Sequence, residues 1–353
     1  MAYTDIDKPS DYFNTVLYTG NTTAPRTISG VGFQPDWNWT KSRNRVLNHW
    51  IADSVRGSNK IIRSDTTSTE LTNPSGGYIS SFNSDGYVVT EGSSNDENYN
   101  TNTTTYASWN WKAGTSFTND ASSTGIGSID STGSVNTDAG FSVCSYTGTG
   151  SVGTVKHGLG VTPKMILFKN RTTASNWLVY HEALGNTKNL YLDATNAEHD
   201  RSDTFNDTSP TSSVFTVGTA DLNTSGNSII AYCFNNVQGY SKFGSYTGNG
   251  NADGTFVYTG FKPAFIIQKN KSAADAWVMF DNKRNGYNTA GNEKLYPNSD
   301  AAETDVSEID FTAQGFKLRA GGNQNNNNGE VYIYMAFASN PFVSSTGVPA
   351  TAR

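Results

Sequence analysis

The residues best suited to catalysis in this sequence are three carboxylates that each follow a tryptophan. Asp53 follows Trp50 by three residues, and Asp281 follows Trp277 by four. Glu182 stands five residues after the tryptophan of the middle segment. Two carboxylates that face each other across a groove can act as acid and base in glycoside hydrolysis. No HExxH, GxSxG or P-loop pattern accompanies them, so we predict no enzyme, no catalytic residue and no cofactor.

The histidines and cysteines do not suggest a metal site. The histidines are His49, His157, His181 and His199, and none has a counterpart at a repeated position. No Cys/His cluster has zinc spacing. Cys144 and Cys233 are either two small core residues or one disulfide within a single domain. Asx-rich turns at 83–87 and 249–254 lack the spacing of an EF-hand, and such turns form without an ion.

The strongest pattern is a unit that occurs three times. Each copy has a Tyr-Thr-Gly motif, then Gly-x-x-Pro, then a lysine and a tryptophan at nearly fixed offsets, which indicates an internal repeat. The matching residues are Tyr18, Tyr146 and Tyr246; Pro35, Pro163 and Pro263; Lys41, Lys169 and Lys269; and Trp50, Trp177 and Trp277. We take the tryptophans as core residues. The lysines form a binding site repeated three times, a solubilising rim, or structural pairs with a loop carboxylate.

Short β-strands must position these residues. Thr, Val, Tyr, Phe and Trp favour strands, Gly, Asn, Asp and Ser favour turns, and no segment shows a capped helical period. About seven to nine strands in a unit of ~100 residues suit a two-sheet antiparallel sandwich with adjacent first and last strands. We predict an all-β protein of three tandem, related antiparallel β-sandwich domains, jelly-roll or lectin-like, with little helix.

The domain boundaries follow from the repeat. The three copies span 12–114, 141–237 and 241–340, and only residues 238–240 separate the last two, so these should dock rigidly. Residues 115–140 contain scarcely any large apolar group and are expected to form a flexible or loosely packed Gly/Ser/Thr linker. Residues 1–11 and 341–353 are expected to be polar tails.

Surface loops are the remaining place for a binding function, because loops on rigid scaffolds carry such functions. The segment GGNQNNNNGE at 321–330 is expected to be an exposed hairpin tip, whose amides could hydrogen-bond sugar hydroxyls. The candidate surface-binding residues are Asn323, Asn325, Asn326, Asn327, Lys169 and Lys269. The alternative for 321–330 is a solvated tip without a ligand.

Composition limits the possible partners and location. The net charge is −6 with an isoelectric point near 5.2, and no basic run occurs, which argues against nucleic acid as the main partner. No stretch approaches the ~18 apolar residues of a membrane span. The N-terminal residues lack the basic and apolar regions of a secretory signal, so we expect synthesis in a cytoplasm.

Several longer runs resemble a family of virion or tail-fibre-like proteins from marine bacteriophages. FNTVLYTGN, GFQPDWNWTKSR and YASWNWKAG are similar to the family's first copy, and VKHGLGVTPKMILFKNR and FVYTGFKPAFIIQKN to its later copies. The resemblance covers nearly the whole chain. It implies a virion setting and no catalytic residues.

Three functions remain open at this stage. The first is a tail-fibre or receptor-binding appendage that contacts a host surface glycan or protein receptor and assembles as a homo-oligomer such as a trimer. The second is a capsid decoration, head-fibre or tail adaptor protein that contacts other virion proteins. The short chain and the lack of a coiled-coil stalk favour it. The third, which we weight least, is a glycan-degrading enzyme.

Overall fold

The structure, a computed structural model, describes residues 2–90, 98–284, 291–322 and 324–350. It is all-β, with antiparallel pairing between all its named strands. The helical elements among the described residues are single turns: η1 (Pro9–Asp11), α1 (Ala121–Thr124), η2 (Glu182–Leu184) and α2 (Ser202–Phe205). The prediction of an all-β chain with little helix is therefore confirmed. None of these helices is long and apolar enough to cross a membrane.

The first repeat forms two sheets. The larger has the order β1-β9-β3-β4-β5-β6 and the smaller the order β2-β8-β7. Its strands are β1 (Phe13–Thr19), β2 (Arg26–Ser29), β3 (Trp37–Ser42), β4 (Trp50–Asp53), β5 (Lys60–Arg63), β6 (Leu71–Thr72), β7 (Ile79–Asn83), β8 (Gly86–Val89) and β9 (Thr105–Trp111). The first and last strands are paired along their whole length, as the sequence predicted.

The second repeat has the same order, with two strands added before it. Its larger sheet runs β10-β11-β12-β19-β14-β15-β16-β17, and β13 pairs with β18. The strands are β10 (Thr115–Asn119), β11 (Ser131–Asn136), β12 (Phe141–Thr147), β13 (Gly153–Lys156), β14 (Met165–Asn170), β15 (Leu178–His181), β16 (Lys188–Tyr191), β17 (His199–Asp200), β18 (Val214–Val217) and β19 (Ser228–Phe234).

The prediction of a flexible linker at 115–140 is wrong. These residues contain β10 and β11, which pair with each other and with β12. The ring of Phe117 fills the space beside Gly133, where a Cβ would lie 2.5 Å from that ring. A glycine covered by an aromatic ring stabilises a strand pair that is otherwise built from small residues, which explains how so polar a segment is ordered.

The third repeat again pairs its first strand with its last. Its sheets have the orders β20-β28-β22-β23, β21-β27-β26 and β24-β25. The strands are β20 (Ser241–Thr247), β21 (Phe256–Tyr258), β22 (Phe261–Asn270), β23 (Val278–Asp281), β24 (Asn292–Lys294), β25 (Thr304–Val306), β26 (Ile309–Thr312), β27 (Gly315–Leu318) and β28 (Val331–Pro341).

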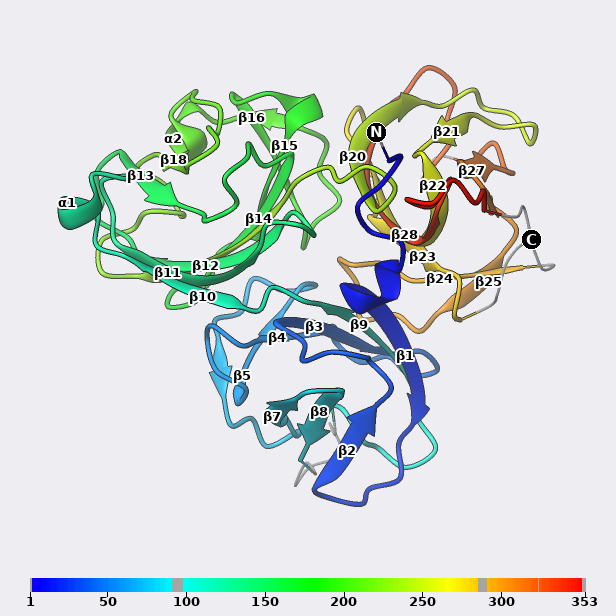
Figure 1. Ribbon diagram of the computed structural model, residues 1–353, viewed down its shortest axis with the longest axis horizontal. Coiled ribbons are helices and arrows are strands. Elements are labelled where there is room, and N and C mark those ends of the chain that lie inside the picture. The colour runs from blue at the N-terminus through cyan, green and yellow to red at the C-terminus, as the bar shows by residue number, and fades with distance from the viewer. Residues whose placement is uncertain (1, 91–97, 285–290, 323, 351–353) are drawn as a thin grey trace.

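The three repeats surround a shared core. Figure 1 shows the blue, green and yellow-to-red lobes arranged about one centre rather than in a row. One apolar cluster draws side chains from all three, including Trp37, Phe234 and Phe337. Each repeat also has a core of its own between its larger and smaller sheets. The central strands of each larger sheet are thus buried on both faces, which explains why β3, β14 and β22 have no exposed residue.

The ends of the chain are not free polar tails. Ile6 is buried in the shared core, and the Tyr3 hydroxyl donates to the Gly260 carbonyl. The Asp7 carboxylate accepts a hydrogen bond of 2.6 Å from the backbone N–H of Ser345. The described terminal residues therefore pack onto the third repeat and onto each other.

Candidate functional site

The Tyr-Thr-Gly motif is a structural brace in every copy. The Tyr18, Tyr146 and Tyr246 hydroxyls donate to backbone carbonyls 2.6–2.9 Å away in the loop before the last strand. The residue after each of those carbonyls is an asparagine: Asn100, Asn223 or Asn326. Its side-chain oxygen accepts the N–H of the residue after the motif glycine, at 2.7–3.1 Å. The three copies thus share one loop clamp.

The glycine of the motif is required by close approach of the backbone. A Cβ on Gly20, Gly148 or Gly248 would lie 2.0–2.3 Å from a carbonyl oxygen of the opposite loop. No side chain can occupy that space unless the backbone moves. The motif is therefore explained by packing and not by a ligand.

The three repeated lysines are buried between repeats. Each ammonium donates to a carbonyl of a neighbouring repeat: Lys41 to Asp300 at 3.1 Å, Lys169 to Thr67 at 3.0 Å and Lys269 to Thr195 at 3.2 Å. The first repeat contacts the third, the third the second, and the second the first. The ring is therefore closed, and we call each of its three contacts a seam.

Lys169 and Lys269 therefore cannot act as surface-binding residues. Both side chains are fully buried. Burial lowers the pKa of each of the three lysines to about 8, because the ammonium is taken out of water. Further carbonyl oxygens from their own repeats, such as Ser175 at 2.5 Å from Lys169 Nζ, replace part of that hydration.

An ion pair accompanies the lysine at each seam. Arg171 binds Glu70 at 2.7 Å, Lys271 binds Glu198 at 3.1 Å, and Arg43 binds Glu303 at 2.7 Å. The cation always stands two residues after the repeated lysine. These pairs lie at equivalent positions and join the same repeats as the lysines do.

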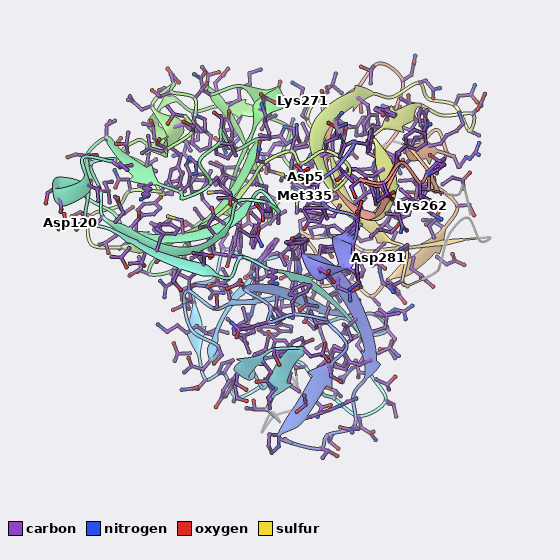
Figure 2. All side chains as sticks on the ribbon, in the orientation of Figure 1. Asp5, Asp120, Lys262, Lys271, Asp281 and Met335 are labelled. Carbon is purple, nitrogen blue, oxygen red and sulfur yellow. The ribbon has the colours of Figure 1, made fainter. Side chains whose placement is uncertain are left out.

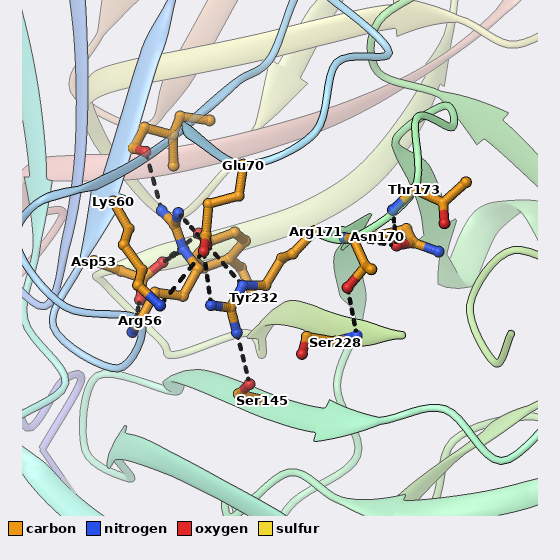
Figure 3. A network of polar contacts seen from close by, with 12 residues as sticks. Asp53, Arg56, Lys60, Glu70, Ser145, Asn170, Arg171, Thr173, Ser228 and Tyr232 are labelled. Atoms are coloured by element: carbon orange, nitrogen blue, oxygen red, sulfur yellow. Dashed lines mark hydrogen bonds and ion pairs between the residues drawn. The ribbon is translucent and has the colours of Figure 1, made fainter. Parts of the chain in front are cut away.

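Figure 3 shows the seam between the first and second repeats. Glu70 lies within 3.6 Å of three cations: Arg56, Lys60 and Arg171. Burial alone would raise the pKa of Glu70, but the hydrogen bonds and charges of Arg171 and Arg56 hold it below its usual value. The Asp53 carboxylate accepts a hydrogen bond from Arg56 Nε at 2.5 Å and another from the Tyr232 hydroxyl of the second repeat at 2.6 Å.

The proposed acid–base carboxylates serve these seams. Asp281, equivalent to Asp53 by strand register, accepts Trp109 Nε1 of the first repeat at 3.0 Å. Asp53 and Asp281 are at most 6 % exposed, and both bind an arginine three residues later. The third carboxylate, Glu182, forms an ion pair with Lys164 instead. Figure 2 labels Asp281 and Met335 near the junction of the lobes.

The seam between the second and third repeats has a different hydrogen-bonded pair, because the donor side chain found at the other two seams is absent there. The position of Trp109 and Tyr232 is occupied in the third repeat by Met335, which has no hydrogen to donate. The facing residue of the second repeat is His181 in place of aspartate, and its Nε2 lies 3.4 Å from the Tyr334 carbonyl. Burial lowers the pKa of His181 to about 4, so the ring is neutral. Its Nδ1 accepts the backbone N–H of Ala183 at 3.1 Å, which leaves Nε2 as the donor.

The prediction that Trp50 is equivalent to Trp177 and Trp277 is wrong by one position. Strand pairing makes Trp50 equivalent to Leu178 and Val278. The residue equivalent to Trp177 and Trp277 is His49, which accepts a hydrogen bond from Trp39 Nε1 at 2.8 Å. Trp177 and Trp277 belong to the shared core, whereas Trp50 lies in the first repeat's own core. A shift of one residue along a strand exchanges its two faces.

The asparagine loop is mostly a structural element. Asn325 and Asn326 are at most 1 % exposed, and Asn326 belongs to the loop clamp described above. Asn327 is half-buried, and its backbone N–H bonds the Tyr332 hydroxyl at 2.9 Å. Asn323 lies outside the described residues. The expectation of an exposed tip is therefore wrong for Asn325 and Asn326.

The remaining chemical groups are buried or dispersed. Cys144 and Cys233 are both free thiols inside the second repeat, so the disulfide alternative is wrong. Within the described residues, no group of three or more His, Cys, Asp or Glu side chains is placed to hold a metal ion.

One cavity at the seam between the first and third repeats has the features of a binding site. It has a volume of about 460 Å³, within the range of roughly 300–1,000 Å³ for small-molecule sites. Trp50, Arg63, Asn98 and Asp300 line it. The Arg63 guanidinium lies 4.8 Å from the Trp50 ring centroid. The sequence did not predict this set of lining residues, because they come from the first repeat and from a loop of the third.

Comparison with known proteins gives a family but no activity. A family model described as "Domain of unknown function (DUF7483)" matches residues 8–341. A search of curated proteins gave no match. The matched segment begins before β1 and ends at the last residue of β28, so one family unit spans all three repeats. The chain therefore belongs to the DUF7483 family.

Proposed function

We propose that this protein is a virion structural protein: a tail-fibre or receptor-binding appendage that contacts glycans on the host surface. In this proposal each repeat is one β-sandwich unit, and the three units form a closed ring instead of a string. The protein is made in the host cytoplasm and functions in the virion without enzymatic activity.

The observation that carries the proposal is the ring itself. Three buried lysines and three ion pairs join the repeats around one shared aromatic core. Such a body holds its surface loops in fixed positions, as a display scaffold must. The resemblance to phage virion proteins supports the setting, and the extent of the family match supports a single unit.

A second candidate is a capsid decoration, head-fibre or adaptor protein that binds other virion proteins. The approximate three-fold arrangement of the repeats favours it (Figure 1). A body with this arrangement can sit on a three-fold axis of a symmetric assembly as a monomer. The first candidate predicts a homo-oligomer such as a trimer, so the mass of the purified protein in solution also distinguishes the two candidates.

The deciding experiment is quantitative mass spectrometry of purified virions, combined with adsorption of virions that lack the protein. A handful of copies per particle together with lost adsorption supports the appendage. Hundreds of copies with normal adsorption supports capsid decoration. Absence of the protein from virions would overturn both.

A further inference from the structure

We propose that the cavity lined by Trp50, which we call the Trp50 pocket, binds a neutral saccharide, one or two sugar residues at the end of a glycan. This inference rests on the proposed function and names the site and ligand class. Four observations support it: unpaired polar atoms, the charges on the wall, the comparison with the sister repeats, and the polar interior behind the pocket.

The first observation concerns two buried polar atoms that belong to residues lining the cavity. Trp50 is 3 % exposed and Asn98 is 2 % exposed. Within the described residues, neither Trp50 Nε1 nor Asn98 Oδ1 has a hydrogen-bond partner. The indole is a donor only and the amide oxygen an acceptor only. A sugar hydroxyl both accepts and donates, so it matches both atoms, and leaving them unpaired costs about 1–3 kcal/mol each.

The second observation is the charge of the wall. Arg63 comes from the first repeat and Asp300 from the third, and both line the pocket. The two opposite charges favour a ligand without net charge over an anion or a cation. Exposed Val46, at 66 % exposure, adds an apolar surface at the same site, which suits the C–H faces of a sugar ring.

The third observation is a comparison within the chain. The same fold is built three times, so a residue that differs from both sister repeats is not required by the features that the three repeats share. Trp50 is replaced by Leu178 and Val278 at the equivalent positions. Asn98 stands two residues before the clamp asparagine, where the sister repeats have Asp221 and Gln324. The lining of the pocket is therefore specific to the first repeat.

The fourth observation is the polar interior behind the pocket. Thr40 is paired with Trp50 across the strands, and its hydroxyl donates to Asn38 at 2.9 Å. The Asn38 amide in turn donates to Asn110 at 2.8 Å. The positions of Asn38 in the sister repeats hold Ile166 and Ile266. The first repeat has thus exchanged apolar core for hydrogen-bonding groups where Trp50 lies.

The test uses the full chain and a panel of neutral hexoses, N-acetylhexosamines and their disaccharides. Binding is measured by saturation-transfer NMR, and the tightest sugar is titrated by calorimetry. Trp50→Leu installs the residue of the second repeat, so the variant should fold. We expect it to lose at least tenfold in affinity, whereas Tyr258→Leu, which removes an exposed aromatic elsewhere, should bind as wild type does.

A second variant keeps the test decisive if Trp50→Leu does not fold. Arg63→Tyr installs the residue of both sister repeats and keeps the backbone carbonyl that accepts Trp177 Nε1. It should also weaken binding several-fold. Equal affinity of the folded variants and wild type, or no binding by wild type to any sugar in the panel, would overturn the site. Neither result changes the copy number in virions, so the virion role stands or fails separately.

Discussion

The buried pair of Asp53 and Arg56 allows a test of how the seams hold the ring. Both side chains are fully inaccessible to solvent. Replacing Asp53 by asparagine removes the charge that faces Arg56 Nε and weakens the acceptor of the Tyr232 hydroxyl. Breaking a buried ion pair from one side costs about 3–5 kcal/mol, because the remaining charge stays buried. Glu70, 3.1 Å from Arg56 Nη1, offsets part of this cost, so we expect about 3 kcal/mol.

The second repeat supplies the matched double variant. It carries His181 and Leu184 at the positions of Asp53 and Arg56, so the fold accepts a neutral pair there. Asp53→His with Arg56→Leu leaves no buried arginine without a partner, and the histidine ring can still form a hydrogen bond with the Tyr232 hydroxyl. Replacing a complete buried pair by neutral residues is often close to neutral, so we expect the double variant within about 1.5 kcal/mol of wild type.

The assay is equilibrium unfolding in urea, followed by the fluorescence of the buried tryptophans. Asp138→Asn, at an exposed position, controls for loss of one negative charge. The reasoning is refuted if Asp53→Asn unfolds within about 0.5 kcal/mol of wild type. It is equally refuted if the double variant is as unstable as Asp53→Asn, because the pair would then be needed for more than charge balance.

Three further predictions follow from the ring and its loops. Gly148→Ala should lose about 1–3 kcal/mol, since its Cβ would lie 2.3 Å from the Thr224 carbonyl, while Gly322→Ala, with open space, should be neutral in the same urea assay. Burial raises the pKa of Asp65 to about 6, so its stabilising contribution is present below about pH 4 and lost as pH rises through about 6. Asp65→Asn introduces the residue type that the third repeat has at the equivalent position, Asn298. The variant should therefore have a free energy of unfolding about 2–3 kcal/mol above that of wild type at pH 7. The same difference between variant and wild type at about pH 4 and at pH 7 would contradict this. Calorimetry of the whole chain should give one cooperative transition, because the repeats share a core, whereas separate peaks would show independent domains.

Sequence reasoning found the repeat because it depends on residue types at fixed offsets. Strand content and the pairing of first and last strands followed from composition and periodicity. The position of His49 was also within reach: counted from Lys41, Lys169 and Lys269, the equivalent residues His49, Trp177 and Trp277 all follow by eight. Counting from the proline gave one longer interval and led to Trp50 instead.

The ring was out of reach because its bonds join residues that no local pattern connects. A lysine is almost never fully buried unless its charge is paired or hydrogen-bonded, so the sequence favoured an exposed position for Lys169. Its partner is a main-chain carbonyl of Thr67, about a hundred residues away, and a carbonyl carries no sequence signal. The polar segment with β10 and β11 failed differently, because one ring, that of Phe117, orders a strand pair of small residues.

Because one unit occurs three times in the chain, residues that the fold requires can be distinguished from residues that it does not require. Features present in all copies, such as the lysines and the loop clamps, are explained by the fold. Features that change together with a neighbour, such as His181 opposite Met335 in place of an aspartate opposite a donor, are explained by the seams. Trp50 and Asn98 belong to neither class, since they differ from the equivalent residues of the other repeats and have polar atoms without a partner among the described residues. The other two repeats fold with different residues at these positions, so the fold itself does not require Trp50 or Asn98. That is why we assign these two residues to a ligand.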